Sequence, residues 1–190
     1  MRTVLDDLPC VLILASGRGE RFRASGGTMH KLAAPLGAST VLEHTLAAVR
    51  ASGLPWHLED AGHPGMGDSL AAAVRATAGA SGWLVLPGDL PLVQPQTLRK
   101  VADALRNGAQ AAQPVHAGER GHPVGFGAAC GPALMALSGQ QGGSPVLKAL
   151  REAGAVVLVQ VDDAGVLADI DTLQDLARAE ALLRARGSAA

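Results

Sequence analysis

A glycine-rich stretch with basic residues follows the first apolar run of the chain and has the residue types that bind phosphate. It reads Leu14-Ala-Ser-Gly-Arg-Gly-Glu-Arg-Phe22, and Lys31 follows nine residues later. Glycines let backbone N–H groups point inward as an anion nest, while Arg18, Arg21 and Lys31 add charge that can meet several phosphate oxygens. These residues predict a triphosphate-binding loop, although a Gly-Arg-Gly turn after a strand can also be a plain surface connection.

The stretch differs from the two commonest phosphate-binding loops. It has no Gly-Lys-Ser or Gly-Lys-Thr end, which a P-loop requires. The run Gly17-x-Gly19-x-x-Phe22 also lacks the third glycine of the dinucleotide-binding fingerprint. The sequence therefore indicates a nucleotide loop of another kind.

Three aspartates follow predicted strands and could bind a metal ion. Asp89 comes after the apolar run Trp83–Leu86, at the sheet edge where open α/β folds bind their ligands. Asp169 and Asp171 alternate with Ile170 along another predicted strand, so both carboxylates should lie on one side. If that side faces Asp89, a hard cation such as Mg²⁺ can bind between them. Asp89 could instead cap the next segment from its Pro-Gly-Asp turn, and Asp171 could be only a helix-start residue.

The elements that must position these residues alternate between strands and helices, as in an α/β fold with a mostly parallel sheet. Strands are predicted at 10–15, 56–59, 83–86, 110–115, 123–127, 155–161 and 166–170. Helices are predicted at 41–52, 69–77, 95–107, 131–138, 145–152 and 172–186. Thr40-Val-Leu-Glu43 is a capping box, Asp68 or Ser69 is expected to cap the second helix, and Thr172 the last.

Length and composition bound the architecture. With 190 residues, 48% of them apolar, the chain can bury a sizeable core, and we expect one domain over residues 1–186 with a disordered tail at 187–190. Aromatic residues make up only 2%, which argues against a stacking surface for single-stranded nucleic acid. The formal charge is −1 without a basic run, so no nucleic-acid partner is expected.

Other compositional features point to a soluble protein of the cytoplasm. No apolar stretch approaches the roughly 20 residues that cross a bilayer, so no membrane partner is expected. Cys10 and Cys130 form no Cys-x-x-Cys motif, and we see no secretory leader, which together favour a reducing compartment. None of the six histidines has the spacing of a structural zinc site.

Five short motifs occur in the order found in a known family. They are Leu14-Ala-Ser-Gly-x-Gly-x-Arg-Phe22 with Lys31, Gly65-Met-Gly-Asp-Ser-Leu70, Gly88-Asp-Leu-Pro91, Arg120-Gly-His-Pro123 and Asp169-Ile-Asp-Thr172. The set resembles the molybdenum cofactor cytidylyltransferase (MocA-like) group of the MobA-like nucleotidyltransferase superfamily. The resemblance implies a three-layer Rossmann-like nucleotidyltransferase fold. It also implies transfer of CMP from CTP to the phosphate of molybdopterin, with Mg²⁺ as cofactor, and a molybdoenzyme as a possible recipient of the product.

The resemblance implies roles for individual residues. The residues that match the triphosphate loop are Ala15, Ser16, Gly17, Arg18, Gly19 and Lys31. Gly67 and Ser69 match the loop that contacts base and ribose. Asp89 matches the Mg²⁺-binding aspartate, and Asp169 or Asp171 matches a second metal contact. The residues that match the segment near the acceptor pocket are Arg120, Gly121, His122 and Pro123, although His122 could be an exposed loop histidine. Arg18, Lys31 and Asp89 are the expected catalytic residues.

The segment 56–64 departs from the family pattern. Family members usually place a helix and another strand between the second strand and the Gly-Met-Gly loop, and these nine residues cannot hold both. We therefore expect that the sheet lacks one edge βα unit and that Trp56–Glu59 is an edge strand beside the first strand. No helix is expected between residues 57 and 66. An exposed edge strand makes self-association possible.

Three other activities stay open. The first loop of guanylyltransferases in this superfamily usually reads Leu-Ala-Gly-Gly, so Leu14-Ala-Ser-Gly17 and the Arg-Gly-His-Pro segment favour CTP over GTP. A non-catalytic cofactor carrier or chaperone is the second alternative, and the retention of Lys31, Asp89, Asp169 and Asp171 argues against it. A sugar-phosphate or isoprenoid-precursor nucleotidyltransferase would use the same nucleotide half with another acceptor.

Overall fold

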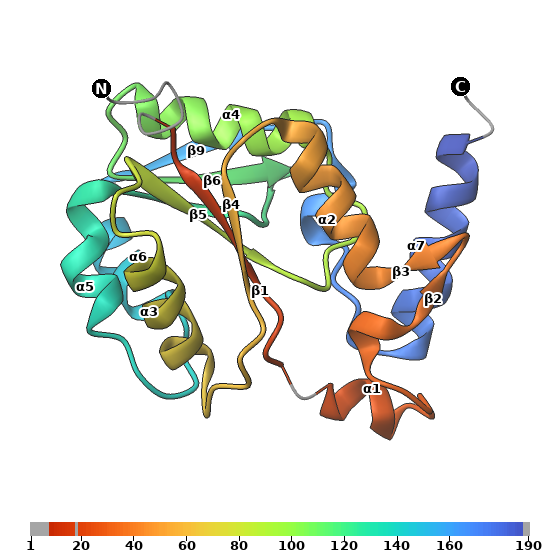
Figure 1. The fold of residues 1–190 in the computed structure, drawn as a ribbon. Coiled ribbons are helices and arrows are strands. Elements are labelled where there is room, and N and C mark those ends of the chain that lie inside the picture. Colours follow the sequence, from red (N-terminus) through yellow and green to blue (C-terminus); the bar gives the residue numbers. More distant parts are fainter. Residues whose placement is uncertain (1–7, 18, 188–190) are drawn as a thin grey trace.

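In the computed structural model, which describes residues 8–17 and 19–187, a mixed sheet lies between helices on both of its faces (Figure 1). The strands run in the order β4-β1-β5-β8-β6-β7, and β9 pairs with β6. Their bounds are β1 Cys10–Leu14, β4 Trp56–Glu59, β5 Gly82–Pro87, β6 Ala111–His116, β7 Glu119–Arg120, β8 Val124–Gly127 and β9 Val156–Gln160. Strands β4, β1 and β5 are parallel, as are β6 and β9. Strand β8 pairs antiparallel with both β5 and β6, and β7 pairs antiparallel with β6.

Strand β1 is buried on both sides because its side chains feed two hydrophobic clusters. Val11 and Ile13 pack with helices α2 (Val41–Ser52) and α4 (Pro95–Arg106) on one face. Cys10 and Leu12 pack on the other face with α3 (Met66–Ala76), α5 (Gly131–Met135) and α6 (Ser144–Glu152). A strand covered on both faces needs the continuous apolar run seen in this sequence.

A third hydrophobic cluster lies beside the sheet and joins segments that are far apart in the chain. It contains Phe22 of α1 (Glu20–Ala24), Leu32 of the 3₁₀ helix η2 (Lys31–Ala33), Ile170, and Ala179 of α7 (Leu173–Gly187). The two-stranded ribbon of β2 (Pro35–Leu36) and β3 (Ser39–Thr40) packs there as well, and Figure 1 shows α1, the ribbon and α7 grouped at one side of the sheet. This cluster holds the segment of Lys31 next to the segment of Asp171.

Most of the predicted elements are confirmed. The Thr40 hydroxyl accepts a hydrogen bond from the Glu43 N–H at 3.3 Å, so the capping box starts α2. Helix α4 begins at Pro95. Strand β4 is an edge strand parallel to β1, and residues 57–65, all of which the structure describes, contain no helix. That a βα unit has been lost relative to other family members stays a prediction.

The predicted strand at 166–170 is wrong. The chain forms the 3₁₀ helix η4 over Ala164–Leu167, and residues 168–170 follow without strand pairing. The Asp163 carboxylate accepts the Gly165 N–H at 3.0 Å, which favours a tight turn over an extended chain. Val166 and Ile170 are both buried. Their separation by four residues would also place both side chains on one face of a strand, which is why the sequence pattern predicts one.

The predicted cap of α3 is also wrong. Helix α3 begins at Met66 with Gly65 as its N-cap, and neither Asp68 nor Ser69 caps it. The Gly67 N–H is instead satisfied by the Gly139 carbonyl at 2.7 Å, so this end of the helix needs no capping side chain. At the other end of the chain, α7 continues to Gly187, one residue into the expected tail, and residues 188–190 lie outside the described residues.

Among the described residues, no helix combines the length and the apolar character needed to cross a membrane.

Candidate functional site

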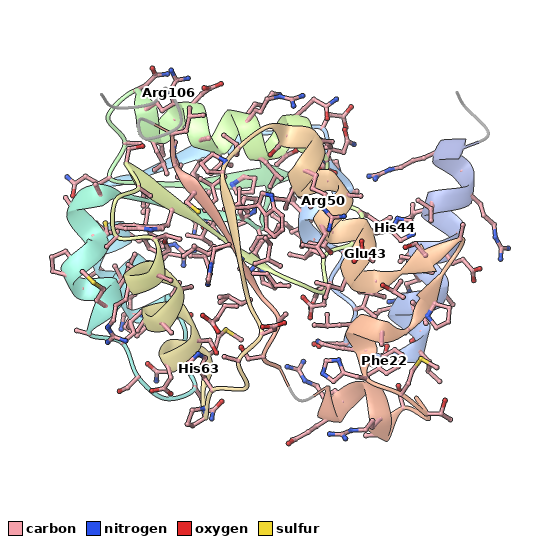
Figure 2. The ribbon with its side chains drawn as sticks, viewed as in Figure 1. Phe22, Glu43, His44, Arg50, His63 and Arg106 are labelled. Carbon is pink, nitrogen blue, oxygen red and sulfur yellow. The ribbon has the colours of Figure 1, made fainter. Side chains whose placement is uncertain are left out.

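A cavity of about 490 Å³ opens at the carboxyl ends of the parallel strands β1 and β5. The Gly88 N–H donates to the Leu14 carbonyl at 2.9 Å, which holds together the two loops that leave these strands. Figure 2 shows two of the lining residues, Phe22 and His63, on opposite sides of the region below β1. The predicted site residues that line the cavity are Ser16, Gly17, Gly19, Lys31, Ser69, Asp89 and Asp171.

One end of the cavity is built from charged groups. The Lys31 Nζ donates to Asp89 Oδ2 at 2.5 Å and to Asp171 Oδ1 at 2.9 Å. Burial on its own would lower the pKa of Lys31, but the carboxylates of Asp89 and Asp171 outweigh it and raise that pKa. Arg21, which is exposed, also pairs with Asp171. The lysine therefore stays charged and bridges two acids that come from separate loops.

His30 positions the glycine-rich loop. Its Nδ1 lies 3.3 Å from the Leu32 N–H and accepts that hydrogen bond, so in the neutral ring Nε2 carries the hydrogen. Nε2 then donates to the Gly17 carbonyl at 2.6 Å. Gly19 adopts the left-handed conformation with φ of 62°, which a glycine adopts without strain. Arg18, predicted as a catalytic residue of this loop, lies outside the described residues.

The acids at this end have the properties of metal ligands. Asp89 Oδ1 is buried and has no hydrogen-bond partner among the described residues. Burial and the nearby charges of Asp89 and Asp171 raise the pKa of Asp169. A cation would relieve both unfavourable features. Lys31 and Arg21 occupy both carboxylate oxygens of Asp171, whereas Lys31 occupies only Oδ2 of Asp89 and leaves its Oδ1 without a described partner. Asp169 does not line the cavity, but besides burial its raised pKa reflects the nearby charges of Asp89 and Asp171. Asp89, with Asp169 near it, is therefore the acid with a free oxygen for a metal.

A metal bound here would take most of its ligands from elsewhere. Within residues 8–17 and 19–187, no group of three histidine, cysteine, aspartate or glutamate side chains forms a complete metal site. Mg²⁺ commonly binds through one or two carboxylates together with substrate phosphates and water. The two acids therefore fit Mg²⁺ that arrives with a nucleotide better than a metal held by protein alone.

The other end of the cavity is organised by one buried carboxylate. Glu59 ends β4 and is 7% exposed. Its Oε1 accepts from the Ala61 N–H at 3.2 Å and from His63 Nε2 at 3.1 Å, and its Oε2 contacts His57 Nε2 at 3.4 Å. Burial opposes the charge, but the Ala61 N–H and the two imidazoles outweigh it and lower the pKa of Glu59.

Two serines link this end to the glycine-rich loop. Ser16 Oγ lies 2.8 Å from Ser69 Oγ, and the Ser69 hydroxyl donates to the Gly65 carbonyl at 3.1 Å. The Ser16 hydroxyl also lies 3.4 Å from the Glu59 carbonyl. Ala15 does not line the cavity, but its N–H donates to the same carbonyl at 2.9 Å. Glu59 therefore contacts the loop through its backbone and His63 through its side chain.

Two glycines, one before and one inside α3, allow the loop at residues 138–140 to pack closely against the start of this helix. A Cβ atom on Gly65 would lie 2.2 Å from the Gly139 carbonyl oxygen, and one on Gly67 would lie 2.7 Å from the Ser138 oxygen. Gln140 from this loop lines the cavity and donates to the Pro64 carbonyl at 2.9 Å. Gly67 is thus next to the cavity and is not one of its lining residues.

The four residues predicted near an acceptor lie outside the lining of the cavity. None of Arg120, Gly121, His122 and Pro123 lines the cavity, and Arg120 is exposed on β7. Gly121 packs against Val166, where a Cβ atom would lie 2.4 Å from the Val166 oxygen. His122 is half-buried, so the alternative of an exposed loop histidine is wrong. Burial lowers its pKa, against the opposing charges of Asp89 and Asp169, which places His122 near both acids.

The sequence reasoning missed Glu59, His63 and His30. Glu59 carries the same signal as Asp89, an acid at the carboxyl end of a parallel strand, but its strand β4 is short and lies at the edge of the sheet. His63 and His30 act through tertiary hydrogen bonds to Glu59 and Gly17, which no local pattern encodes.

Comparison with known proteins identifies both the family and the fold. The MobA-like NTP transferase domain family matches residues 48–156. No match was found among curated proteins. A nucleotidyl transferase from Methanothermobacter has 24% identity and a TM-score of 0.77, with 94% of this chain and 99% of that chain covered.

Two further solved structures share the fold. The Rv0371c protein of Mycobacterium tuberculosis H37Rv, in complex with manganese, has 23% identity and a TM-score of 0.67, with 91% of this chain and 97% of that chain covered. Molybdopterin-guanine dinucleotide biosynthesis protein A from Archaeoglobus fulgidus has 19% identity and a TM-score of 0.60, with 92% and 98% covered. The family match spans more than half of the chain, and the chain therefore belongs to the MobA-like NTP transferase domain family and is a nucleotidyltransferase.

Proposed function

We propose that the protein transfers CMP from CTP to the phosphate of molybdopterin or of the molybdenum cofactor, with Mg²⁺ as its metal, and releases pyrophosphate. The observation that carries this proposal is the meeting of Lys31, Asp89 and Asp171 at one end of a 490 Å³ cavity. Basic groups, carboxylates and a glycine-rich loop are what a triphosphate with a divalent cation requires.

The residues at the charged end act by neutralising charge and by alignment. An acceptor phosphate is already anionic near neutral pH, so it needs no general base. Lys31, together with Arg18, would hold the departing pyrophosphate, and the backbone of Ser16, Gly17 and Gly19 would bind phosphate oxygens. Asp89 and Asp169 would hold Mg²⁺, which when bound screens the charge on the α-phosphate.

The segment at 120–123 supports an acceptor next to this end. His122 lies near Asp89 and Asp169, and its lowered pKa keeps its ring neutral near pH 7. A neutral imidazole can donate or accept a hydrogen bond without adding charge to the metal site. We place the pterin phosphate on this side, with Arg120 as an exposed residue at its approach, and a molybdoenzyme as the recipient of the finished cofactor in the cytoplasm.

Transfer of GMP from GTP is the second candidate. The Archaeoglobus neighbour is named for molybdopterin-guanine dinucleotide biosynthesis, which favours a guanine nucleotide. The loop of this chain reads Leu14-Ala-Ser-Gly17, with serine where guanylyltransferases usually have glycine, and Ser16 bonds to Ser69 in the cavity. This serine is the reason for placing CTP first.

Pyrophosphate release is the test of the proposed reaction. CTP or GTP is mixed with the protein, Mg²⁺ and molybdenum cofactor, and parallel reactions omit the acceptor or contain EDTA. We expect release with CTP that requires both acceptor and metal. Faster release with GTP would favour the second candidate. Tight acceptor binding with no release from either nucleotide would identify a carrier and contradict the proposal.

A further inference from the structure

His63 lies in the segment between β4 and α3 and lines the cavity on the side opposite Phe22, which packs with Leu32 next to Lys31. Its neighbours in the lining include Pro64, Met66 and Ser69, which carry no charge. Figure 2 shows His63 at the foot of α3, across from the side that carries Phe22. A triphosphate bound by the charged end would therefore leave its base close to His63.

The contact with Glu59 fixes which nitrogen of His63 carries the hydrogen. Glu59 Oε1 lies 3.1 Å from His63 Nε2, and an ionised carboxylate can only accept hydrogen bonds. The Ala61 N–H and the imidazoles of His57 and His63 favour that ionised form. His63 Nε2 must therefore donate, and in the neutral ring Nδ1 is then an acceptor.

An acceptor at this position distinguishes bases by their exocyclic groups. Cytosine carries an amino group at C4, which can donate to a nitrogen acceptor, whereas uracil carries a carbonyl oxygen there. Two facing acceptors repel each other and leave both groups without a hydrogen bond. Such a mismatch in a partly buried site typically weakens binding by roughly tenfold or more.

We propose that His63, held by Glu59 with its hydrogen on Nε2, selects cytidine over uridine nucleotides by accepting a hydrogen bond from the C4 amino group. The inference rests on the proposed function of the cavity as a CTP site and assigns the residue that reads the base. Guanine also carries an amino group, so exclusion of GTP belongs to other residues of the lining.

Calorimetric titration with CTP and UTP in the presence of Mg²⁺ tests this assignment through the ratio of their dissociation constants. In the wild-type protein we expect CTP to bind roughly tenfold or more tightly than UTP. His63→Ala should bring the ratio close to one, mainly by weakening CTP. His63→Asn places an amide oxygen near the position of Nδ1 and should restore part of the preference.

Glu59→Gln tests the role of the tautomer. A side-chain amide can donate to His63 Nε2, which allows the hydrogen to move to Nδ1 and turns the acceptor into a donor. The preference for CTP should then fall below that of the wild type or invert towards UTP. A purely structural role for Glu59 predicts equal weakening of both nucleotides.

His57→Gln is the matched control, because His57 contacts the other oxygen of the same carboxylate and does not line the cavity. It should keep the wild-type ratio. Circular dichroism checks the fold of each variant. An unchanged ratio in folded His63→Ala overturns the inference while CTP binding itself upholds the proposed function, whereas absence of binding by any nucleotide in the wild type overturns both.

Discussion

The two ends of the cavity use buried charge in different ways. At one end Lys31 bridges Asp89 and Asp171, and Asp89 keeps a buried oxygen without a described partner. At the other end every described contact of the Glu59 carboxylate is with a hydrogen-bond donor, namely Ala61 N–H, His57 and His63. The first arrangement can exchange partners with a cation and phosphates, whereas the second fixes the orientation of a ring. Substitutions at the first end should change the rate of transfer, and those at the second end should change the choice of base.

Asp89→Asn should have the largest effect. The amide keeps the shape of the side chain but lacks the charge that a hard cation requires, so Mg²⁺-dependent transfer should fall roughly 100-fold or more. Nucleotide affinity should fall much less, because the metal is needed most in the transition state. Pyrophosphate release and CTP titration measure the two quantities. Near-normal release in this variant would remove the metal role of Asp89.

Lys31→Ala should lower turnover and triphosphate affinity together, each by roughly tenfold or more, since it removes a charge-assisted hydrogen bond. Lys31→Arg keeps the charge and serves as the matched comparison. Arg18→Ala is expected to act in the same direction from the sequence alone. Wild-type kinetics in both alanine variants would separate the glycine-rich loop from the phosphates.

Asp169→Asn and Asp171→Asn should change the unfolding temperature of the ligand-free protein in opposite directions. The folded-state pKa of Asp169 is raised, so its charge opposes folding above the unfolded pKa of about 3.9. Asp169→Asn should therefore raise the unfolding temperature at pH 7, and this gain should disappear as the pH falls towards that value. Asp171→Asn removes the charged partner of Lys31 and Arg21 and should therefore lower the unfolding temperature.

Transfer rates separate the same two variants by function. Both should lose less activity than Asp89→Asn, and a greater loss in Asp169→Asn than in Asp171→Asn would support Asp169 as the second metal ligand. Stabilisation of the ligand-free protein by both substitutions would contradict the assignment of Asp171 to the ion pairs.

The smallest effect is expected for the change that Glu59→Gln makes in the free energy of unfolding. Its folded-state pKa lies below its unfolded value of about 4.3, so the stability it provides is present above that pH and is lost as the pH falls through the folded-state value. Glu59→Gln should cost about 1 kcal/mol of unfolding free energy at pH 7. Denaturant unfolding of both proteins between pH 3 and pH 7 measures this, and a cost that grows as the pH falls below 4 would reverse the sign.

The charged end could be predicted from the sequence because its residues carry the signal themselves. Lys31 is a basic residue after a glycine-rich loop, and Asp89 follows a buried strand. The alternation of Asp169 and Asp171 along a strand is wrong as a prediction, because the chain there is not a strand. The pairing of Asp171 with Lys31 comes from the cluster of Phe22 and Ile170, which joins distant segments.

The other end depends on contacts that only the folded chain creates. The Gly67 N–H at the start of α3 donates to the Gly139 carbonyl, which lies about seventy positions further along the chain, so the prediction of a local cap at Asp68 or Ser69 is wrong. His63 acquires its orientation from Glu59 across a short loop. Local propensity and spacing carry no information about such pairs.

A crystal structure of the protein with CTP and Mg²⁺ tests most directly the central claim that the two ends hold the two halves of one nucleotide. The account predicts the triphosphate beside Lys31 and the glycine-rich loop, the metal on Asp89, and the cytosine amino group within hydrogen-bonding distance of His63 Nδ1. A nucleotide bound outside this cavity, or bound in reverse with its base against Asp89, would contradict it.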